Sequence, residues 1–95
     1  MEKQKEVALK VFDEISEKWC LDEEEKNLLL GDTKDQIIRI SHMMSIYRAL
    51  HTIYEDKDRA NAWIKKPNRR FCGRPAIEAI IEDPQQVQKY LEAQL

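Results

Sequence analysis

The side chains best suited to nucleophilic or metal chemistry are two histidines and two cysteines, and their spacing forms no known cluster. His42 and His51 lie nine residues apart, whereas two metal ligands on one helix face need a spacing of three or four. Cys20 and Cys72 each lack the nearby second cysteine of a zinc-binding pair. We expect no metal site. A Cys72–His51 nucleophile is the one catalytic alternative, and His51 is better interpreted as a hydrogen-bonded core or interface histidine.

Cofactor chemistry has no sequence signature either. The chain contains two glycines, Gly31 and Gly73, which are too few for a glycine-rich loop that cradles a phosphate. No other group of residues is typical of a catalytic site. We therefore expect a non-catalytic protein with no cofactor.

The composition favours a small, all-α domain. The chain has 95 residues, of which 42% are hydrophobic and 36% charged, a balance too apolar for a disordered chain and too polar for a membrane protein. No apolar run reaches the ~20 residues that cross a bilayer, and the first residues lack the apolar core of a signal peptide. Two glycines and three prolines disfavour a many-turned β fold. We expect a compact cytoplasmic domain in which both cysteines stay reduced.

Apolar periodicity and cap residues predict about six helices, which must position any functional side chain. The first covers residues 5–20, where apolar residues recur along one face. The second covers about 22–30, because Asp22 and Glu25 have the spacing of a capping box. Gly31 is then a good helix terminator.

A long third helix is expected at the centre of the domain. It starts near Asp32 or Thr33 and includes residues 36–54 without a breaker. Its apolar positions cover roughly 200° of the circumference, about twice the stripe of a one-sided surface helix, although Arg39 lies near this apolar arc. Such a helix is central to the domain or shared with a second chain. The expected homodimer interface uses Met43, Tyr47, Leu50 and Tyr54.

Prolines delimit the remaining helices. Asp56 or Asp58 caps a fourth helix, which must end before Pro67 because proline disfavours helical geometry in the residue before it. A loop follows, and Pro75 suits the first turn of a fifth helix. Pro84 begins the last helix in the same way.

The net charge of −2 conceals an asymmetry along the chain. Residues 1–35 contain eleven acidic and six basic side chains, and residues 36–95 contain seven acidic and ten basic ones. The basic excess concentrates in Lys65, Lys66, Arg69, Arg70 and Arg74. One local basic patch on an acidic chain suits non-specific nucleic-acid binding poorly, because that affinity grows with the number of phosphates neutralised.

The segment that carries this patch has a distinctive pattern. Its parts are Ala60 and Trp63 in the fourth helix, Pro67-Asn68 at the start of the loop, and Phe71-Cys72-Gly73 at its end. Over about residues 37–92 the chain resembles the toxin-binding domain of the Xre/MbcA/ParS family of type II antitoxins. Two positions depart from that family, which often has glycine at Cys72 and usually has one in place of Glu82-Asp83.

The resemblance implies two regions. Residues 1–35 resemble a truncated Xre-like helix-turn-helix, and residues 36–95 resemble the toxin-binding domain. A recognition helix intervenes in the family, whereas this chain passes almost directly from Gly31 to Ile37, so we expect negligible specific DNA binding. The family's partner is typically a RES-domain toxin that consumes NAD, which the antitoxin blocks by occluding its active site.

We therefore expect an antitoxin-like protein that binds and neutralises a RES-domain toxin. Trp63 and Phe71 are candidate aromatic anchors, or alternatively core residues. The candidate hydrogen-bond donors are Arg69, Arg70 and Arg74. The expected partner-binding residues are Trp63, Pro67, Asn68, Arg69, Arg70, Phe71, Gly73, Arg74 and Leu95. The alternatives are a DNA-binding autorepressor of the same operon and an orphan dimeric adaptor.

Overall fold

The computed structural model describes residues 2–31 and 34–95, and its regular elements in these ranges are helices. The α-helices are α1 (Glu2–Lys18), α2 (Glu23–Leu30), α3 (Gln36–Ile53), α4 (Lys57–Ala62), α5 (Ala76–Glu82) and α6 (Pro84–Glu92). Two short 3-10 helices, η1 (Trp63–Lys65) and η2 (Arg69–Phe71), lie between α4 and α5. The predicted all-α fold with six helices and one long central helix is confirmed. None of the described helices combines the length and the apolarity that crossing a membrane requires.

Local signals in the sequence determine where α2 begins. The Asp22 carboxylate accepts a hydrogen bond from the Glu25 amide at 2.8 Å, and the Glu25 carboxylate accepts one from the Asp22 amide at 3.0 Å. These two bonds form the predicted capping box, which satisfies amides that the first helical turn leaves free.

Two further helix starts follow the same local rules, whereas Pro75, expected in the first turn of the fifth helix, is the N-cap residue of α5. Asp56, not Asp58, caps α4, because its side chain accepts a hydrogen bond from the Asp58 amide. Pro84 occupies the first turn of α6 as expected. The start of the third helix near Asp32 or Thr33 lies outside the described residues, and α3 itself begins at Gln36.

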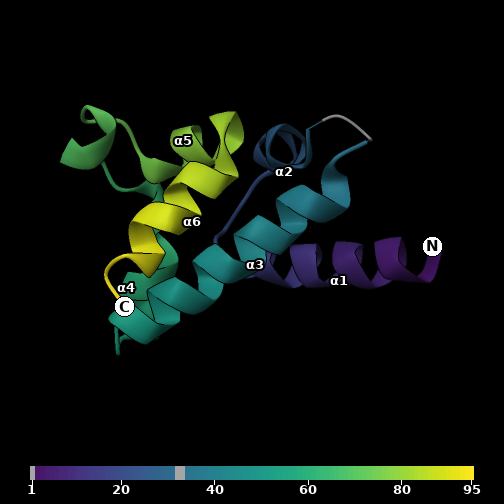
Figure 1. The fold of residues 1–95 in the computed structure, drawn as a ribbon, viewed down its shortest axis with the longest axis horizontal. Coiled ribbons are helices and arrows are strands. Elements are labelled where there is room, and N and C mark those ends of the chain that lie inside the picture. Colours follow the sequence, from purple (N-terminus) through teal and green to yellow (C-terminus); the bar gives the residue numbers. More distant parts are fainter. Residues whose placement is uncertain (1, 32–33) are drawn as a thin grey trace.

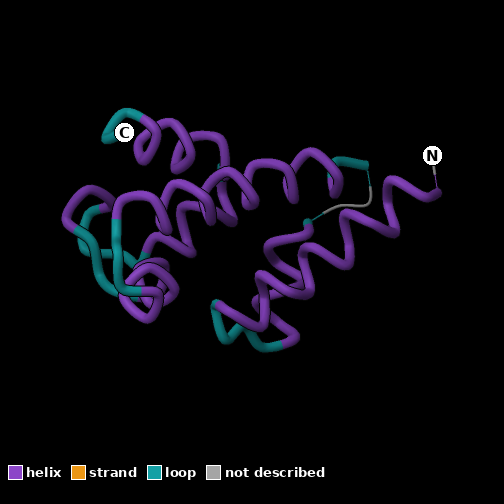
Figure 2. Tube along the Cα trace, turned by 90° about the horizontal axis from the view of Figure 1, so that it is seen from below, coloured by secondary structure: helices purple, strands orange, loops and turns teal. Residues whose placement is uncertain are grey.

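Helix α3 lies at the centre of the molecule. Figure 1 shows α1 running beside it along the long axis, with α2 near one end and α4, α5 and α6 gathered towards the other. The two chain termini lie at opposite ends of the molecule (Figures 1 and 2). One hydrophobic core joins Phe12 of α1, Ile46 of α3 and Leu91 of α6. Residues 1–35 and 36–95 therefore contribute to the same core.

Arg39 connects three helices. Its Nε donates to the Leu29 carbonyl at 2.6 Å, and its Nη2 donates to the Ile81 carbonyl at 2.9 Å. These carbonyls lie in the last turns of α2 and α5, where no intrahelical donor remains. Gly31, beside this contact, has a φ of +64°, and a Cβ atom there would lie 3.2 Å from Arg39 Nε. The charged residue near the apolar arc of α3 thus has a structural role.

Candidate functional site

The segment from Pro67 to Pro75, called here the arginine loop, is closed on itself. Pro67 and Pro75 form an isolated antiparallel bridge, and the Asn68 amide donates to the Arg74 carbonyl at 3.1 Å. The Asn68 side chain accepts a hydrogen bond from the Arg70 amide at 2.9 Å. Because these bonds join the two ends of the loop, little backbone freedom remains to be lost on binding.

Two consecutive residues in the left-handed region turn the chain at the end of the loop. Cys72 has a φ of +59° and Gly73 a φ of +82°. The Gly73 amide donates to the Asn68 carbonyl at 2.9 Å. Glycine adopts this region without steric cost, so Cys72 holds a conformation for which glycine is the easier choice.

Aromatic contacts attach the arginine loop to the rest of the domain. The ring of Phe71 packs edge-on against Trp63, with centroids 6.3 Å apart, and against Tyr90 of α6, with centroids 5.9 Å apart. Phe71 is only 8% exposed, whereas Trp63 is half-buried. Of the two roles expected for Phe71, an aromatic anchor or a core residue, its burial favours the core residue, because its ring holds the loop on α6.

Arg70 faces a groove between the loop and α6. Its guanidinium lies over the Tyr90 ring, 5.1 Å from the centroid, which is cation–π distance. The groove has a volume of about 430 Å³. Its lining residues are Arg70, Phe71, Gln86, Lys89, Tyr90 and Ala93. We call it the loop–α6 groove.

The chemistry of the loop–α6 groove suits a negatively charged or carbonyl-bearing group. Arg70 and Lys89 supply two cations, and Gln86 supplies an amide. The guanidinium of arginine holds several N–H donors in one plane, an arrangement that matches a carboxylate. The contact with the Tyr90 ring restricts the positions that this group adopts. The groove therefore offers a charged rim beside an aromatic floor.

The other two loop arginines have different environments. Arg74 is held by Glu82 of α5, with N–O distances of 2.8 and 3.4 Å. Hydrogen bonding and charge attraction between them raise the pKa of Arg74 and lower the pKa of Glu82. Arg69 is exposed and forms no ion pair with the described residues. The three arginines expected to act together are thus divided, and only Arg70 lines the groove.

The remaining predicted partner-binding residues frame the same region. Pro67 and Asn68 fix the loop backbone, as described above. Leu95 is 66% exposed, just beyond the end of α6. Both ends of the expected surface, the loop and the C-terminal residues, therefore border the loop–α6 groove, which Ala93 lines near Leu95.

Sequence reasoning missed the contribution of one face of α6. Gln86, Lys89, Tyr90 and Ala93 line the groove, and their spacing of three, four and seven residues from the first places them on one helical face. That periodicity was available in the sequence. The apolar residues of the other face, such as Val87 and Leu91, give the stronger pattern, and they are buried in the core.

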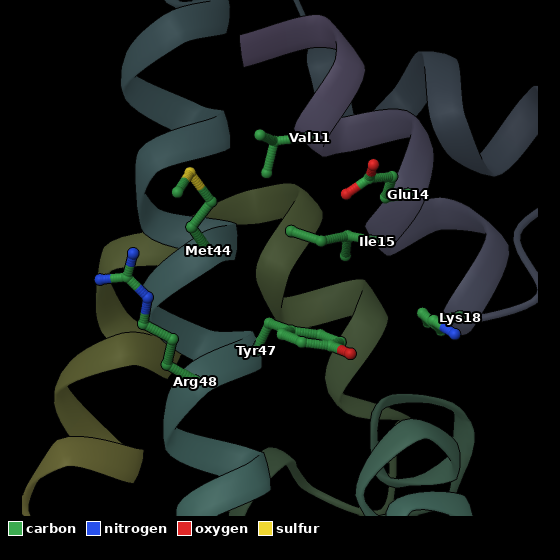
Figure 3. A pocket seen from close by; sticks show the side chains of 7 residues that line it. All are labelled: Val11, Glu14, Ile15, Lys18, Met44, Tyr47 and Arg48. Carbon is green, nitrogen blue, oxygen red and sulfur yellow. The ribbon is translucent and has the colours of Figure 1, made fainter. Parts of the chain in front are cut away.

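Two of the four residues predicted for a homodimer interface are internal. Met43 and Leu50 have no exposed surface, so their assignment to an interface is wrong. Both belong to the hydrophobic core that α3 shares with the helices packed against it. Tyr47 and Tyr54 are half-buried. Tyr47 lines a groove between α1 and α3, where it faces Ile15 (Figure 3).

Both histidines are hydrogen-bonded within the chain. His42 Nδ1 pairs with the Gln88 side chain, and His51 Nε2 lies 2.9 Å from the Asn61 side-chain oxygen. The His51 ring also stacks near Tyr47, with centroids 4.3 Å apart. His51 thus occupies a hydrogen-bonded position between α3 and α4.

Comparison with known proteins yields one similar sequence of undetermined role. The chain is 29% identical to the uncharacterized protein y4oB of Sinorhizobium fredii over 106 aligned residues, which cover 90% of this chain and 82% of that protein. No family model matches the chain. No solved structure gives a significant match. The arrangement of the loop–α6 groove is therefore the main basis for a functional proposal.

Proposed function

We propose that this chain is a non-catalytic, antitoxin-like protein that binds and neutralises a RES-domain toxin of a type II toxin–antitoxin system. The observation that carries the proposal is the loop–α6 groove, in which Arg70 lies over Tyr90 beside Lys89. The resemblance of residues 37–92 to the antitoxin family supplies the class of partner. We place the protein in the cytoplasm, where its two exposed, unpaired cysteines stay reduced.

The proposed mode of inhibition is occlusion of the toxin's active site. The arginine loop is already closed by internal hydrogen bonds, so docking costs little backbone entropy. Arg70 then donates to a carboxylate or carbonyl at the mouth of the enzyme pocket. The exposed Leu95 and the residues next to it cover the adjoining toxin surface.

The proposal predicts a RES-domain toxin gene next to the gene for this chain, and the test compares variants of this surface for binding to that toxin. Arg70→Glu combined with removal of residues 92–95 should abolish protection of cells that express the toxin. Each change alone should weaken binding to the purified toxin at least ~30-fold, because buried arginine contacts typically contribute ~2 kcal/mol or more. Circular dichroism should show unchanged helicity, because Arg70 and residues 92–95 are exposed.

Arg59→Glu is the matched control. Arg59 also lies over an aromatic ring, that of Tyr54, at 5.8 Å, but it does not line the loop–α6 groove. This variant should bind the toxin as the wild type does. Full protection by the Arg70 and C-terminal double variant would overturn the proposal, and so would a wild-type chain that fails to bind the neighbouring toxin.

A further inference from the structure

A second groove lies between α1 and α3. It consists of two adjoining hollows of about 260 and 460 Å³, both of which Val11 and Met44 line. Figure 3 shows Val11 and Ile15 of α1 facing Met44 and Tyr47 of α3 across it. We call the two hollows together the α1–α3 groove. It shares no lining residue with the loop–α6 groove.

The α1–α3 groove exposes large apolar side chains at one end. Val7 of α1 is 61% exposed and Ile37 of α3 is 42% exposed, and both line the groove. These residues lie near the start of each helix, whereas Glu14, Lys18 and Arg48 line the other end. Since α1 and α3 run in the same direction (Figure 1), the exposed apolar side chains lie at one end of the groove, which Lys3 also lines, and most of its charged side chains lie at the other end.

The exposed area of the chain is larger than a monomer of its size needs. A folded protein of 11.3 kDa exposes on average about 5,700 Å². This chain exposes 6551 Å². The excess of roughly 800 Å² is about the area that one partner contributes to a standard protein–protein interface. A partner docked over the α1–α3 groove and the surface around it would bury an area of this order.

The charged end of the groove carries both signs, Glu14 beside Lys18 and Arg48, and a patch of both signs can pair with a second copy of the chain. Glu14 lies on the α1 side and Arg48 on the α3 side (Figure 3), and neither forms an ion pair with any residue that the structure describes. In a two-fold dimer the same patch meets itself. When the two-fold axis runs parallel to the length of the groove, the α1 of each copy lies opposite the α3 of the other. Glu14 of each copy then meets Arg48 of the other, and Val7 meets Ile37.

We infer that the α1–α3 groove is the interface of a two-fold homodimer, held by its apolar end and by two reciprocal Glu14–Arg48 ion pairs. The inference does not depend on the proposed toxin binding, because the two grooves are separate. It replaces Met43 and Leu50, which are buried in one chain, with residues that a single chain leaves exposed.

Charge-reversal variants test the inference by sedimentation equilibrium. The wild type should have twice the mass of one chain at about 100 μM. Glu14→Arg and Arg48→Glu should each raise the dimer dissociation constant at least ~10-fold. In either variant, residues 14 and 48 carry the same charge, and they meet at both symmetry-related contacts of the dimer. The chain with both changes should regain the dimer. An equimolar mixture of the two single variants should form a heterodimer, because both of its ion pairs then join opposite charges.

Control variants separate the groove from a general effect of charge. Glu6→Arg reverses an exposed charge of α1 that does not line the groove, and it should leave the dissociation constant unchanged. Val7→Asp combined with Ile37→Asp should give a monomer with unchanged circular dichroism, because both side chains are exposed in one chain. A monomeric wild type would overturn the inference, as would an unaltered dimer of the Val7 and Ile37 variant. Failure of the two single variants to form a heterodimer would also overturn it.

Discussion

Ser16 of α1 is buried with a hydroxyl that lacks a partner. The residue is 2% exposed, and its Oγ, like Trp19 Nε1, has no hydrogen-bond partner among the described residues. A buried, unpaired polar group costs about 1–3 kcal/mol. Ser16→Ala should therefore raise the free energy of unfolding by about 1 kcal/mol, since it removes the hydroxyl and leaves the packing nearly unchanged. Urea denaturation at a fixed protein concentration measures this change.

Ser41→Ala is the control for Ser16. Ser41 is exposed on α3, so its hydroxyl is solvated and its removal relieves no burial cost. Only the small difference in helix propensity between serine and alanine remains there. If Ser16→Ala destabilises the protein more than Ser41→Ala does, the Ser16 hydroxyl has a partner that stabilises the fold.

At the scale of the helices, Arg39 holds together elements that are far apart in the sequence. Its donors reach the C-terminal carbonyls of α2 and α5, where the helix dipoles place partial negative charge. Hydrogen bonds from a charged group contribute roughly 1.5–3 kcal/mol each. Arg39→Met should lower the free energy of unfolding by about 3 kcal/mol, as measured by urea denaturation.

Two further substitutions identify the cause of that loss. Arg39→Lys keeps the charge but lacks the planar fork that reaches two carbonyls, so it should recover only part of the stability. Arg69→Met removes an exposed arginine and should change the free energy of unfolding by less than about 0.5 kcal/mol. An Arg39→Met variant as stable as Arg69→Met would contradict the structural role of Arg39.

The helices themselves were predictable because their signals are local. The capping box of Asp22 and Glu25 is confirmed by both of its hydrogen bonds. The proline rule ended the fourth helix before Pro67, although the structure adds that its last turn is the 3-10 helix Trp63–Lys65. Such features depend on residues three or four apart, which the sequence displays directly.

The side-chain environments were less predictable because they depend on distant contacts. Arg39 stood out near the apolar arc of α3, but its partner Ile81 lies 42 residues away. The sequence left Phe71 open as an anchor or a core residue, and the packing of α6 against its ring shows that it is buried. Likewise, the composition of α3 cannot reveal that other helices already cover Met43.

At the scale of the whole molecule, the two grooves have different chemistry. The loop–α6 groove is bordered by Arg70 and Lys89, whereas the α1–α3 groove has apolar residues at one end and both signs of charge at the other. A self-associating surface needs complementary charges on one patch. A surface for an acidic or carbonyl-bearing partner needs one sign. A homodimer formed through the α1–α3 groove would leave the loop–α6 groove accessible on each copy.

The distribution of charge also bears on DNA binding, the main alternative function. Residues 1–35, which resemble a truncated helix-turn-helix, contain eleven acidic and six basic side chains, and α2 opens with Glu23, Glu24 and Glu25. A DNA-reading face needs lysine or arginine directed at phosphates. In the described part of the chain, α3 follows α2 with no helix between them.

We predict that the protein does not bind its own promoter selectively. Fluorescence anisotropy should give the same weak affinity for the promoter and for a scrambled duplex of equal length, at about 150 mM salt. That affinity should fall only slightly as salt rises, because few phosphates are neutralised and few counterions are released. A specific operator complex typically binds at least ~1,000-fold more tightly than a non-specific one. A preference of that size for the promoter would contradict this prediction. It would favour the autorepressor over the proposed protein that acts through toxin binding alone.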